Sequence, residues 1–289
     1  MKSAAVIGRF SPSPTGDLHF GSLVCAVGSY LAAISGQWLI RIEDLDPPRE
    51  VAGSADGILR DLHSLGLNSS IAILYQSNRT AAYEQAVDYL LTTGQAYYCG
   101  CSRKDLPESG IYPGTCRNGI GAGKKARSVR FLIKPQTCMF TDKVQGVIKE
   151  TMSPDSGDFI IKRADGLHAY HLAVVVDDHF QGITQVVRGA DLLDSTGNQI
   201  CLQRALGYDT PEYMHLPLVL DSHGNKLSKR DRSDPVRQLA ATECIGLALR
   251  VLGQIPPKGL ALDKLWQWAE KHWDEQGIPR NAAIFPAKV

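Results

Sequence analysis

The segment from Gly8 to Ser22 has the residue types that bind phosphate. It ends in His19-Phe20-Gly21-Ser22, after a stretch in which proline and glycine are frequent. Such a stretch forces a tight turn, so we expect His19 and Gly21 at the start of a helix. Free backbone N–H groups and the positive end of the helix dipole attract anions there. An ordinary strand-to-helix turn with a structural histidine is the alternative interpretation.

A second segment of this kind lies much later in the chain. It is Lys226-Leu227-Ser228-Lys229-Arg230, and a Gly-Asn turn signal precedes it. Three cations in a loop without an apolar partner suit a pyrophosphate group, although a solvated basic loop has the same composition. If the two segments meet in the fold, they form one site for the phosphates of a nucleotide.

The elements that must position these segments alternate between short apolar runs and helical patterns. This alternation indicates βαβ units and a parallel sheet covered on both faces. The first half has predicted strands at Ala4–Gly8, Trp38–Ile42 and Ile71–Tyr75 and predicted helices at Phe20–Ser35, Ala52–Leu65 and Thr80–Thr93. After an interruption, the core resumes with Tyr170–Val176, Thr184–Val187, a helix at Ala190–Leu206, a strand at Leu216–Leu220 and helical patterns at Pro235–Leu252 and Leu262–His272.

The interruption, from about residue 97 to residue 158, carries the closely spaced Cys99, Cys101 and Cys116. Three thiolates and one oxygen, from Tyr112, would make a closed tetrahedral site of the structural kind, and zinc is the metal that this ligand set favours. A packed aromatic ring is the alternative for Tyr112, and Cys138 is a reserve ligand. Basic residues that could follow an RNA backbone lie nearby, with a solvated charged loop as the alternative: Arg103, Lys104, Arg117, Lys124, Lys125, Arg127 and Arg130.

Charge and composition place few limits on function. The net charge is +1 and 44% of the residues are hydrophobic, so bulk charge neither favours nor excludes nucleic acid. The apolar runs are too short to cross a bilayer, and the N-terminal one stops too early for a signal peptide. Seven cysteines spread over the chain favour a reducing setting. These observations favour a cytoplasmic protein without a membrane partner. A monomer is the expected form, and Cys25, Cys201 and Cys244, which lie on predicted helical faces, are expected to be core residues.

These segments resemble the catalytic core of the glutamyl-tRNA synthetases, which are class I aminoacyl-tRNA synthetases. Over roughly residues 4 to 235, the two phosphate segments match the family's H-I-G-H and K-M-S-K-S motifs, and Arg9 to Gly16 match its R-F-x-P-S-P-T-G string. Ser22 replaces the second histidine of the first motif, and Ala190 stands where the family has glutamate. Further matches are Arg41-Ile42-Glu43-Asp44-Leu45-Asp46, with Leu45 in place of threonine, Val174-Val175-Val176-Asp177-Asp178-His179 and Val187-Arg188-Gly189-Ala190-Asp191.

The resemblance implies a Rossmann-type α/β core that activates L-glutamate with ATP and Mg²⁺ as glutamyl-adenylate. Because the attacking α-carboxylate is already ionised, no general base is needed. The task is to neutralise charge on the phosphates and to hold the groups in line. The expected catalytic residues are His19, Lys226 and Lys229. The expected ATP site comprises Pro12, His19, Gly21, Ser22, Lys226, Ser228 and Lys229.

A site for glutamate needs a cation for a carboxylate and an anion for the ammonium. Arginine suits a carboxylate because its planar fork makes two parallel hydrogen bonds. The resemblance assigns the carboxylates to Arg9 and Arg188 and the ammonium to Glu43, with Asp44 and Asp46 in support. The whole expected glutamate site is Arg9, Phe10, Ser11, Pro12, Ser13, Glu43, Tyr170 and Arg188.

Full glutamyl-tRNA synthetases continue with anticodon-binding helical modules, for which the chain after Arg230 is too short. The short form resembles the glutamyl-queuosine tRNA(Asp) synthetases. That family activates glutamate without tRNA and transfers it to the queuosine base in the anticodon loop of tRNA(Asp), and its relatives have a zinc site of the Cys99, Cys101, Tyr112, Cys116 pattern. The expected organisation is a first core half at 1–96, an inserted zinc-binding and acceptor-contacting subdomain at 97–158, a second core half at 159–232 and a helical region without an anticodon-binding domain at 233–289.

Two alternative functions remain at this point. One is a truncated synthetase that charges the 3′ end of a tRNA, and the missing C-terminal modules speak against it. The other is a non-catalytic paralogue that binds zinc and RNA, and the intact nucleotide and glutamate motifs speak against that.

Overall fold

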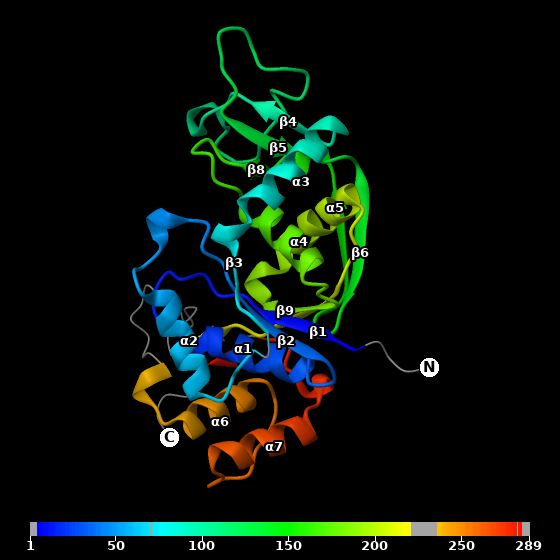
Figure 1. The fold of residues 1–289 in the computed structure, drawn as a ribbon. Helices are drawn as coiled ribbons and strands as arrows, with labels where there is room; N and C mark the ends of the chain where they lie inside the picture. The colour runs from blue at the N-terminus through cyan, green and yellow to red at the C-terminus, as the bar shows by residue number, and fades with distance from the viewer. Residues whose placement is uncertain (1–4, 70, 221–235, 282, 285–289) are drawn as a thin grey trace.

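The computed structural model describes residues 5–69, 71–220, 236–281 and 283–284 (Figure 1). Its α-helices are α1 Phe20–Ala32, α2 Ser54–Ser64, α3 Thr80–Thr92, α4 Tyr170–Phe180, α5 Thr196–Leu206, α6 Ala241–Val251 and α7 Leu262–His272. Its strands are β1 Ile7–Phe10, β2 Gln37–Ile42, β3 Leu74–Tyr75, β4 Ala96–Cys99, β5 Ser128–Phe131, β6 Gln136–Asp142, β7 Gly146–Met152, β8 Ile160–Lys162, β9 Gln185–Gly189, β10 Glu212–Leu216, β11 Val219–Leu220 and β12 Ala283–Ile284.

A parallel sheet forms the centre of the molecule. β1 pairs in parallel with β2, β2 with β3, and β9 with β10. β9 lies beside β1, where the Thr184 N–H donates to the Ile7 carbonyl oxygen at 2.9 Å. One buried apolar cluster joins strands to α1, α2, α6 and α7, and a second joins strands to α3, α4 and α5. Helices therefore cover both faces, and the predicted α/β class with a parallel sheet is confirmed.

Close packing fixes α1 against this sheet. A Cβ at Gly8 of β1 would lie 2.9 Å from the Ala33 Cβ, and one at Gly28 of α1 would lie 2.6 Å from Leu216 Cδ1 of β10. Real Cβ atoms do not approach other atoms so closely without a shift, so the two glycines allow the helix to approach the strands. The N-terminal end of α1 is thereby held at the edge where the parallel strands end.

The second half of the core differs in detail from the sequence-based elements. The run Tyr170–Val176 forms the first part of the helix α4. The predicted helix at Ala190–Leu206 divides into a 3₁₀ segment, Ala190–Ser195, and the helix α5. The predicted strand at Leu216–Leu220 is broken after Leu216, because Pro217 has no N–H for a sheet hydrogen bond.

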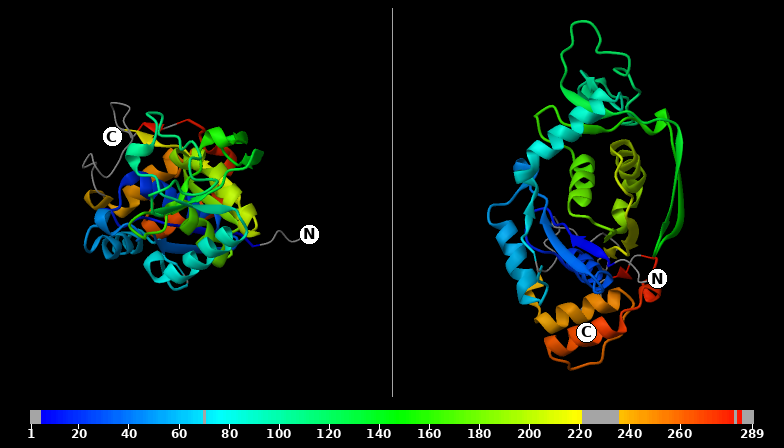
Figure 2. Two further views of the ribbon diagram at one scale, coloured as in Figure 1. Left: turned by 90° about the horizontal axis from the view of Figure 1, so that it is seen from above. Right: turned by 45° about the vertical axis from the view of Figure 1, so that its right-hand side comes forward.

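The region between the core halves forms a second small sheet and a long hairpin. β4, β5 and β8 make an antiparallel sheet at the end of the molecule opposite α6 and α7 (Figures 1 and 2). β6 and β7 pair antiparallel from Gln136 with Met152 to Asp142 with Gly146. At its turn the hairpin meets the core, where β6 runs parallel to β10 and Asp142 lies opposite Tyr213.

The C-terminal helices α6 and α7 pack against the core on the side of α1. The Trp266 indole N–H of α7 donates to the Leu65 carbonyl oxygen at 2.8 Å, just after α2. The prediction of a helix at Leu262–His272 is confirmed. Within the part of the chain that the structure describes, no helix has both the length and the apolar character needed to cross a bilayer.

Candidate active site and metal centre

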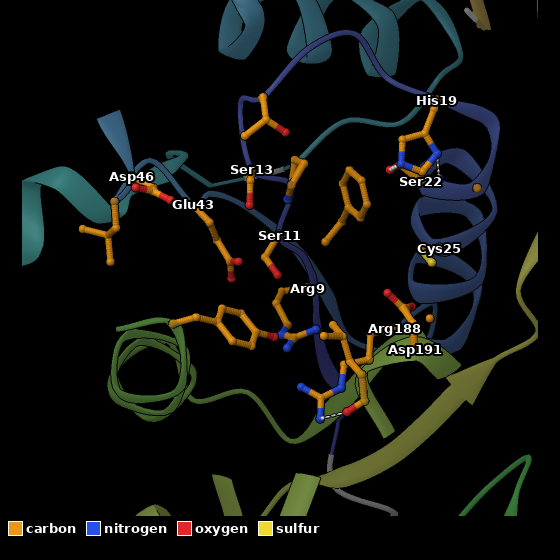
Figure 3. Close-up of a pocket in the computed structure, with 18 of the residues that line it drawn as sticks. Arg9, Ser11, Ser13, His19, Ser22, Cys25, Glu43, Asp46, Arg188 and Asp191 are labelled. Carbon is orange, nitrogen blue, oxygen red and sulfur yellow. Dashed lines mark hydrogen bonds between the residues drawn. The ribbon is translucent and has the colours of Figure 1, made fainter. Parts of the chain in front are cut away.

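One cavity of about 910 Å³ is lined by every described residue of the predicted nucleotide and glutamate sites (Figure 3). β1 pairs in parallel with β2 and lies beside β9. Residues at the carboxyl ends of these strands therefore meet at one edge of the sheet. Lys226, Ser228 and Lys229 lie outside the described residues. The lining residues among the predictions are Arg9, Phe10, Ser11, Pro12, Ser13, His19, Gly21, Ser22, Glu43, Tyr170 and Arg188.

The start of α1 forms one wall of this cavity. His19 is the N-cap residue, and its Nδ1 accepts a hydrogen bond from the Ser22 N–H at 3.1 Å. In the neutral ring Nδ1 is then the acceptor, and Nε2 carries the proton, 2.8 Å from Ser22 Oγ. The first turn of α1 contains no acidic residue. An anion in the cavity would therefore meet the positive end of a helix that has no acidic residue in its first turn.

Arg9 lies at the base of the cavity in a buried cluster of charges. Its Nε and Nη2 donate to the two carboxylate oxygens of Asp178 at 3.0 and 3.2 Å, and its Nη1 donates to the Val187 carbonyl oxygen at 3.4 Å. Asp178 also forms an ion pair with the fully buried Arg41, whose Nη2 lies 2.8 Å from Asp178 Oδ1. Burial raises the pKa of Asp178, but Arg9 and Arg41 outweigh that effect and lower it. Asp178 is therefore an ionised counterion that fixes both guanidinium groups.

Arg188, which also lines the cavity, is held by hydrogen bonds to several protein acceptors. Its Nε donates to His215 Nε2 at 3.0 Å, its Nη1 to Gln199 Oε1 at 2.7 Å and its Nη2 to Thr196 Oγ1 at 2.8 Å. Only 5% of Arg188 is exposed. Protein acceptors therefore already occupy most of the guanidinium fork of both Arg9 and Arg188. A ligand carboxylate can bind only the N–H edges that remain.

Glu43 is a largely buried acid, and one of its two carboxylate oxygens has no hydrogen-bond partner. Its Oε1 is buried without a hydrogen-bond partner and lies 3.6 Å from Arg41 Nη2. Burial raises the pKa of Glu43, against the opposing effects of Arg41, Arg9 and a hydrogen bond from Ser11. A buried acceptor without a partner is costly. The carboxylate is therefore suited to a cationic ligand group in the cavity.

Two expected supports of Glu43 have other partners. The Asp44 carboxylate accepts from the Ser77 backbone N–H at 2.9 Å and from Ser77 Oγ at 2.6 Å. Asp46 pairs with Arg49 and with Arg163 at the cavity mouth. The motif matches indicated no role for Asp178, for Arg41 or for the acceptors around Arg188, although Asp178 and Arg41 lie in matched segments. The only sequence signal for Asp178 was its place in the matched segment Val174–His179.

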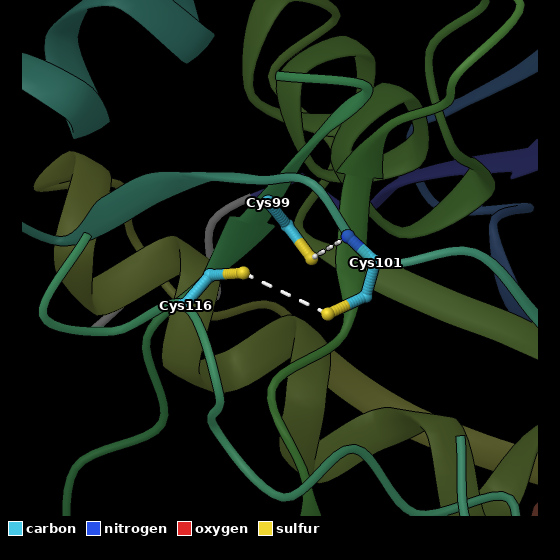
Figure 4. A group of neighbouring side chains, drawn as sticks. All are labelled: Cys99, Cys101 and Cys116. Atoms are coloured by element: carbon cyan, nitrogen blue, oxygen red, sulfur yellow. Dashed lines mark hydrogen bonds between the residues drawn. The ribbon is translucent and has the colours of Figure 1, made fainter. Parts of the chain in front are cut away.

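Cys99, Cys101 and Cys116 converge in the small sheet region, with their sulfur atoms within 4.8 Å of one another (Figure 4). The Tyr112 hydroxyl lies 3.4 Å from Cys99 Sγ and 3.7 Å from Cys101 Sγ, and the Cys101 and Cys116 sulfurs are 3.7 Å apart. Tetrahedral zinc with Zn–S bonds of about 2.3 Å would place its sulfur ligands roughly 3.8 Å apart. The four side chains therefore fit a zinc ion.

The surroundings of the cluster also suit a metal. Burial raises the pKa of the Cys99 thiol, but hydrogen bonds from Tyr112, the Cys101 N–H and Arg130 outweigh it and lower that pKa to about 7. A thiolate is the form that binds metal. Burial and the neighbouring cysteines raise the pKa of Tyr112, so without a metal it remains a phenol.

The other cysteines, and the basic residues near the cysteine cluster, lie partly where the sequence predicted. Cys138 lies 3.6 Å from Cys201 in a separate apolar cluster, so the reserve-ligand prediction is wrong. Cys201 and Cys244 are buried as expected, but Cys25 lines the active-site cavity. Arg117 and Arg130 bond to Asp158 and are not free for RNA, whereas Arg103, Lys104, Lys125 and Arg127 are exposed.

Comparisons with known proteins identify the family. The sequence model of the class I tRNA synthetases (E and Q), catalytic domain, matches residues 5–110 and 113–244. The chain belongs to this family. A relative from Dechloromonas aromatica named glutamyl-Q tRNA(Asp) synthetase is 48% identical, and the match covers 96% of this chain and 97% of that protein. A Cronobacter sakazakii protein of the same name is 47% identical over 97% of this chain and 96% of its own length. The resemblance to glutamyl-queuosine tRNA(Asp) synthetases is confirmed, and the chain is a ligase.

A solved structure supports the same assignment. The crystal structure of a glutamate tRNA ligase from Elizabethkingia meningosepticum, in complex with its amino acid, has a TM-score of 0.82 and 26% identity to this chain. The likeness covers 98% of this chain and 68% of that one. The fold is therefore that of a class I synthetase catalytic core, and the family and its relatives indicate a glutamate-related synthetase.

Proposed function

We propose that this ligase activates L-glutamate with ATP and Mg²⁺, without tRNA, and transfers the glutamyl group to queuosine in the anticodon loop of tRNA(Asp). The observation that carries the first step is a single cavity lined by the start of α1, by two buried arginines and by the Glu43 carboxylate, one oxygen of which has no hydrogen-bond partner. Triphosphate and amino acid can thus lie side by side in one space.

Glutamate recognition follows from the charges of the cavity. The ammonium binds the Glu43 carboxylate, which lines the cavity and has one oxygen without a hydrogen-bond partner. The carboxylates bind the remaining N–H edges of Arg9 and Arg188, one from each arginine rather than both prongs of one fork. Both guanidinium groups are already fixed by protein acceptors, so little side-chain entropy is lost on binding. Ser11 and Tyr170 complete the lining.

Adenylate formation joins an α-carboxylate oxygen to the α-phosphorus of ATP, and the bond from that phosphorus to the bridging oxygen breaks as pyrophosphate leaves. His19 and the first turn of α1 bind phosphate oxygens, and Mg²⁺ arrives with the ATP. Lys226 and Lys229, which lie outside the described residues, are proposed to neutralise the pyrophosphate. Loss of one preorganised donor of this kind typically costs about 3–4 kcal/mol of barrier.

The acceptor is inferred from relatives. Two proteins that match this chain over nearly their whole length are named glutamyl-Q tRNA(Asp) synthetase. The proposed domain limits remain 1–96, 97–158, 159–232 and 233–289, with a cytoplasmic monomer as the working form.

The test of the transfer step uses labelled glutamate, ATP and two matched tRNA(Asp) preparations, one with and one without queuosine. We expect label only on the queuosine-containing tRNA, and we expect it to survive removal of the 3′-terminal nucleotide. In a parallel reaction with queuosine-free tRNA(Glu), label on the 3′ end would instead identify an enzyme that charges tRNA.

We further propose that Cys99, Cys101, Cys116 and Tyr112 hold one structural zinc ion, which ties the chain after β4 to the loop at residue 116. The metal would supply a cross-link in place of an apolar core. We expect the purified protein to contain about one zinc per chain. Cys116→Ser should lose the metal and lower the melting temperature, whereas Cys244→Ser, which changes a buried cysteine far from the cluster, should keep it. Metal-free wild-type protein prepared without chelator would contradict the assignment.

A further inference from the structure

His215 is the residue that accepts a hydrogen bond from Nε of the Arg188 guanidinium. His215 is fully buried on β10, and its Nε2 lies 3.0 Å from Arg188 Nε. On the other side of the ring, Nδ1 lies 2.6 Å from Asp142 Oδ2. The three residues thus form a continuous buried chain from a carboxylate, through an imidazole, to the guanidinium that lines the cavity.

This geometry determines which nitrogen of His215 carries the proton. An arginine N–H can only donate, so Nε2 must be the acceptor and must carry no hydrogen. The proton is then on Nδ1, where the Asp142 carboxylate accepts it. Burial lowers the pKa of His215 and outweighs Asp142, which raises it, while Arg188 and Arg9 also lower it. The imidazole is therefore neutral, and a proton added at Nε2 would point at the Arg188 N–H.

Asp142 is in turn fixed by the turn of the β6–β7 hairpin. Its Oδ1 accepts from the backbone N–H groups of Val144 at 2.9 Å and Gln145 at 2.8 Å, and its carboxylate accepts from the His215 N–H at 3.1 Å. Burial raises the pKa of Asp142, but His215 and these backbone donors lower it. The hairpin that leaves the small sheet thus supplies an ionised group to the core, beside the proposed glutamate pocket.

We propose that His215 and Asp142 are positioning residues for substrate selection: they lock Arg188 in the orientation that presents its remaining N–H edge to a glutamate carboxylate. This inference rests on the proposed role of Arg188. Neither residue lines the cavity, so each acts through Arg188. Thr196 and Gln199 hold the Nη atoms, but only His215 accepts from Nε among the described residues. Loss of that acceptor would leave the buried Nε without a partner and remove one of the contacts that set the plane of the guanidinium.

Two substitutions at His215 distinguish a role in orienting the Arg188 guanidinium from a role in packing alone. Asn resembles the Nδ1 side of the ring and keeps a donor toward Asp142, but it offers no acceptor to Arg188. Gln is long enough to place an amide oxygen where Nε2 lies. In glutamate-dependent pyrophosphate exchange, His215→Asn should raise the KM for glutamate by about 10-fold, as expected for loss of a hydrogen bond to a charged group. The KM for ATP should stay within about 2-fold, since the phosphate wall of the cavity is not involved. His215→Gln should recover most of the glutamate affinity.

Asp142→Asn tests the contact between Asp142 and Nδ1 of His215. Its effect on the glutamate KM should be large in the wild-type background and small in His215→Asn, because both changes break the same chain. An unchanged glutamate KM in His215→Asn, an equal rise for ATP, or no recovery in His215→Gln would each overturn the inference. Wild-type protein that shows no glutamate-dependent exchange would instead overturn the proposed function itself.

Discussion

Arg188→Ala should lower kcat/KM for glutamate by about 100- to 1000-fold, or roughly 3–4 kcal/mol, because it removes a buried charge that binds a carboxylate. Arg188 is almost completely buried and is held by four protein acceptors, from His215, Gln199, Thr196 and the Leu192 carbonyl. These acceptors hold Arg188 in place without the substrate. Removing its side chain should therefore weaken the binding of glutamate and of the transition state for its activation. The KM for ATP should change little, since the phosphates bind at the start of α1.

The control is Arg250→Ala, which removes an exposed arginine at the end of α6. It should leave both substrate constants unchanged. Arg188→Ala also leaves His215 and Gln199 without their partner, so its melting temperature must be compared with that of the wild type. An equal loss for glutamate and ATP in a folded variant would show that Arg188 is structural and does not select the amino acid.

Glu43→Gln should lower kcat/KM for glutamate by about 100-fold, because a neutral amide cannot balance the substrate ammonium in a buried site. The pH dependence gives a second readout. Burial raises the pKa of Glu43 above its ordinary value of 4.5, and only the ionised form binds an ammonium. The KM for glutamate should therefore rise as the pH falls through this raised pKa, and it should do so at a higher pH than for an ordinary glutamate side chain.

Glu43→Gln should remove that rise, because its side chain does not titrate. Glu212→Gln, which changes an exposed acid on β10, should behave like the wild type at every pH. If Glu43→Gln kept the wild-type pH profile and affinity, the ammonium would have to bind elsewhere in the cavity.

Local geometry could be predicted best where a short segment determines its own backbone conformation. The turn-rich stretch before His19 and the strand that precedes it were enough to place a helix N-terminus beside Arg9, because prolines and glycines restrict the local backbone. The three cysteines came together as expected. The single residue between Cys99 and Cys101 keeps those two close, whereas the fold brings Cys116 to them. Parallel strands explain why Glu43 and Arg188, far apart in the chain, share a cavity with Arg9.

What could not be predicted depends on partners from distant elements. Nothing near Arg188 in the sequence indicates that His215 and Gln199 occupy its fork, and nothing near Arg9 indicates that Asp178 does. The same limit applies to Asp44, whose nearness to Glu43 in sequence suggested support while its carboxylate binds Ser77. The run Tyr170–Val176 is apolar on both faces, so its periodicity could not distinguish a buried strand from the helix α4.

The most direct test of the account is ATP–pyrophosphate exchange with the purified wild-type protein in the absence of any tRNA. We expect exchange that depends on L-glutamate, is much weaker with L-glutamine or L-aspartate, and is lost in Arg188→Ala. No exchange with glutamate under conditions where the protein is folded, or equal exchange with all three amino acids, would contradict a cavity built to activate glutamate.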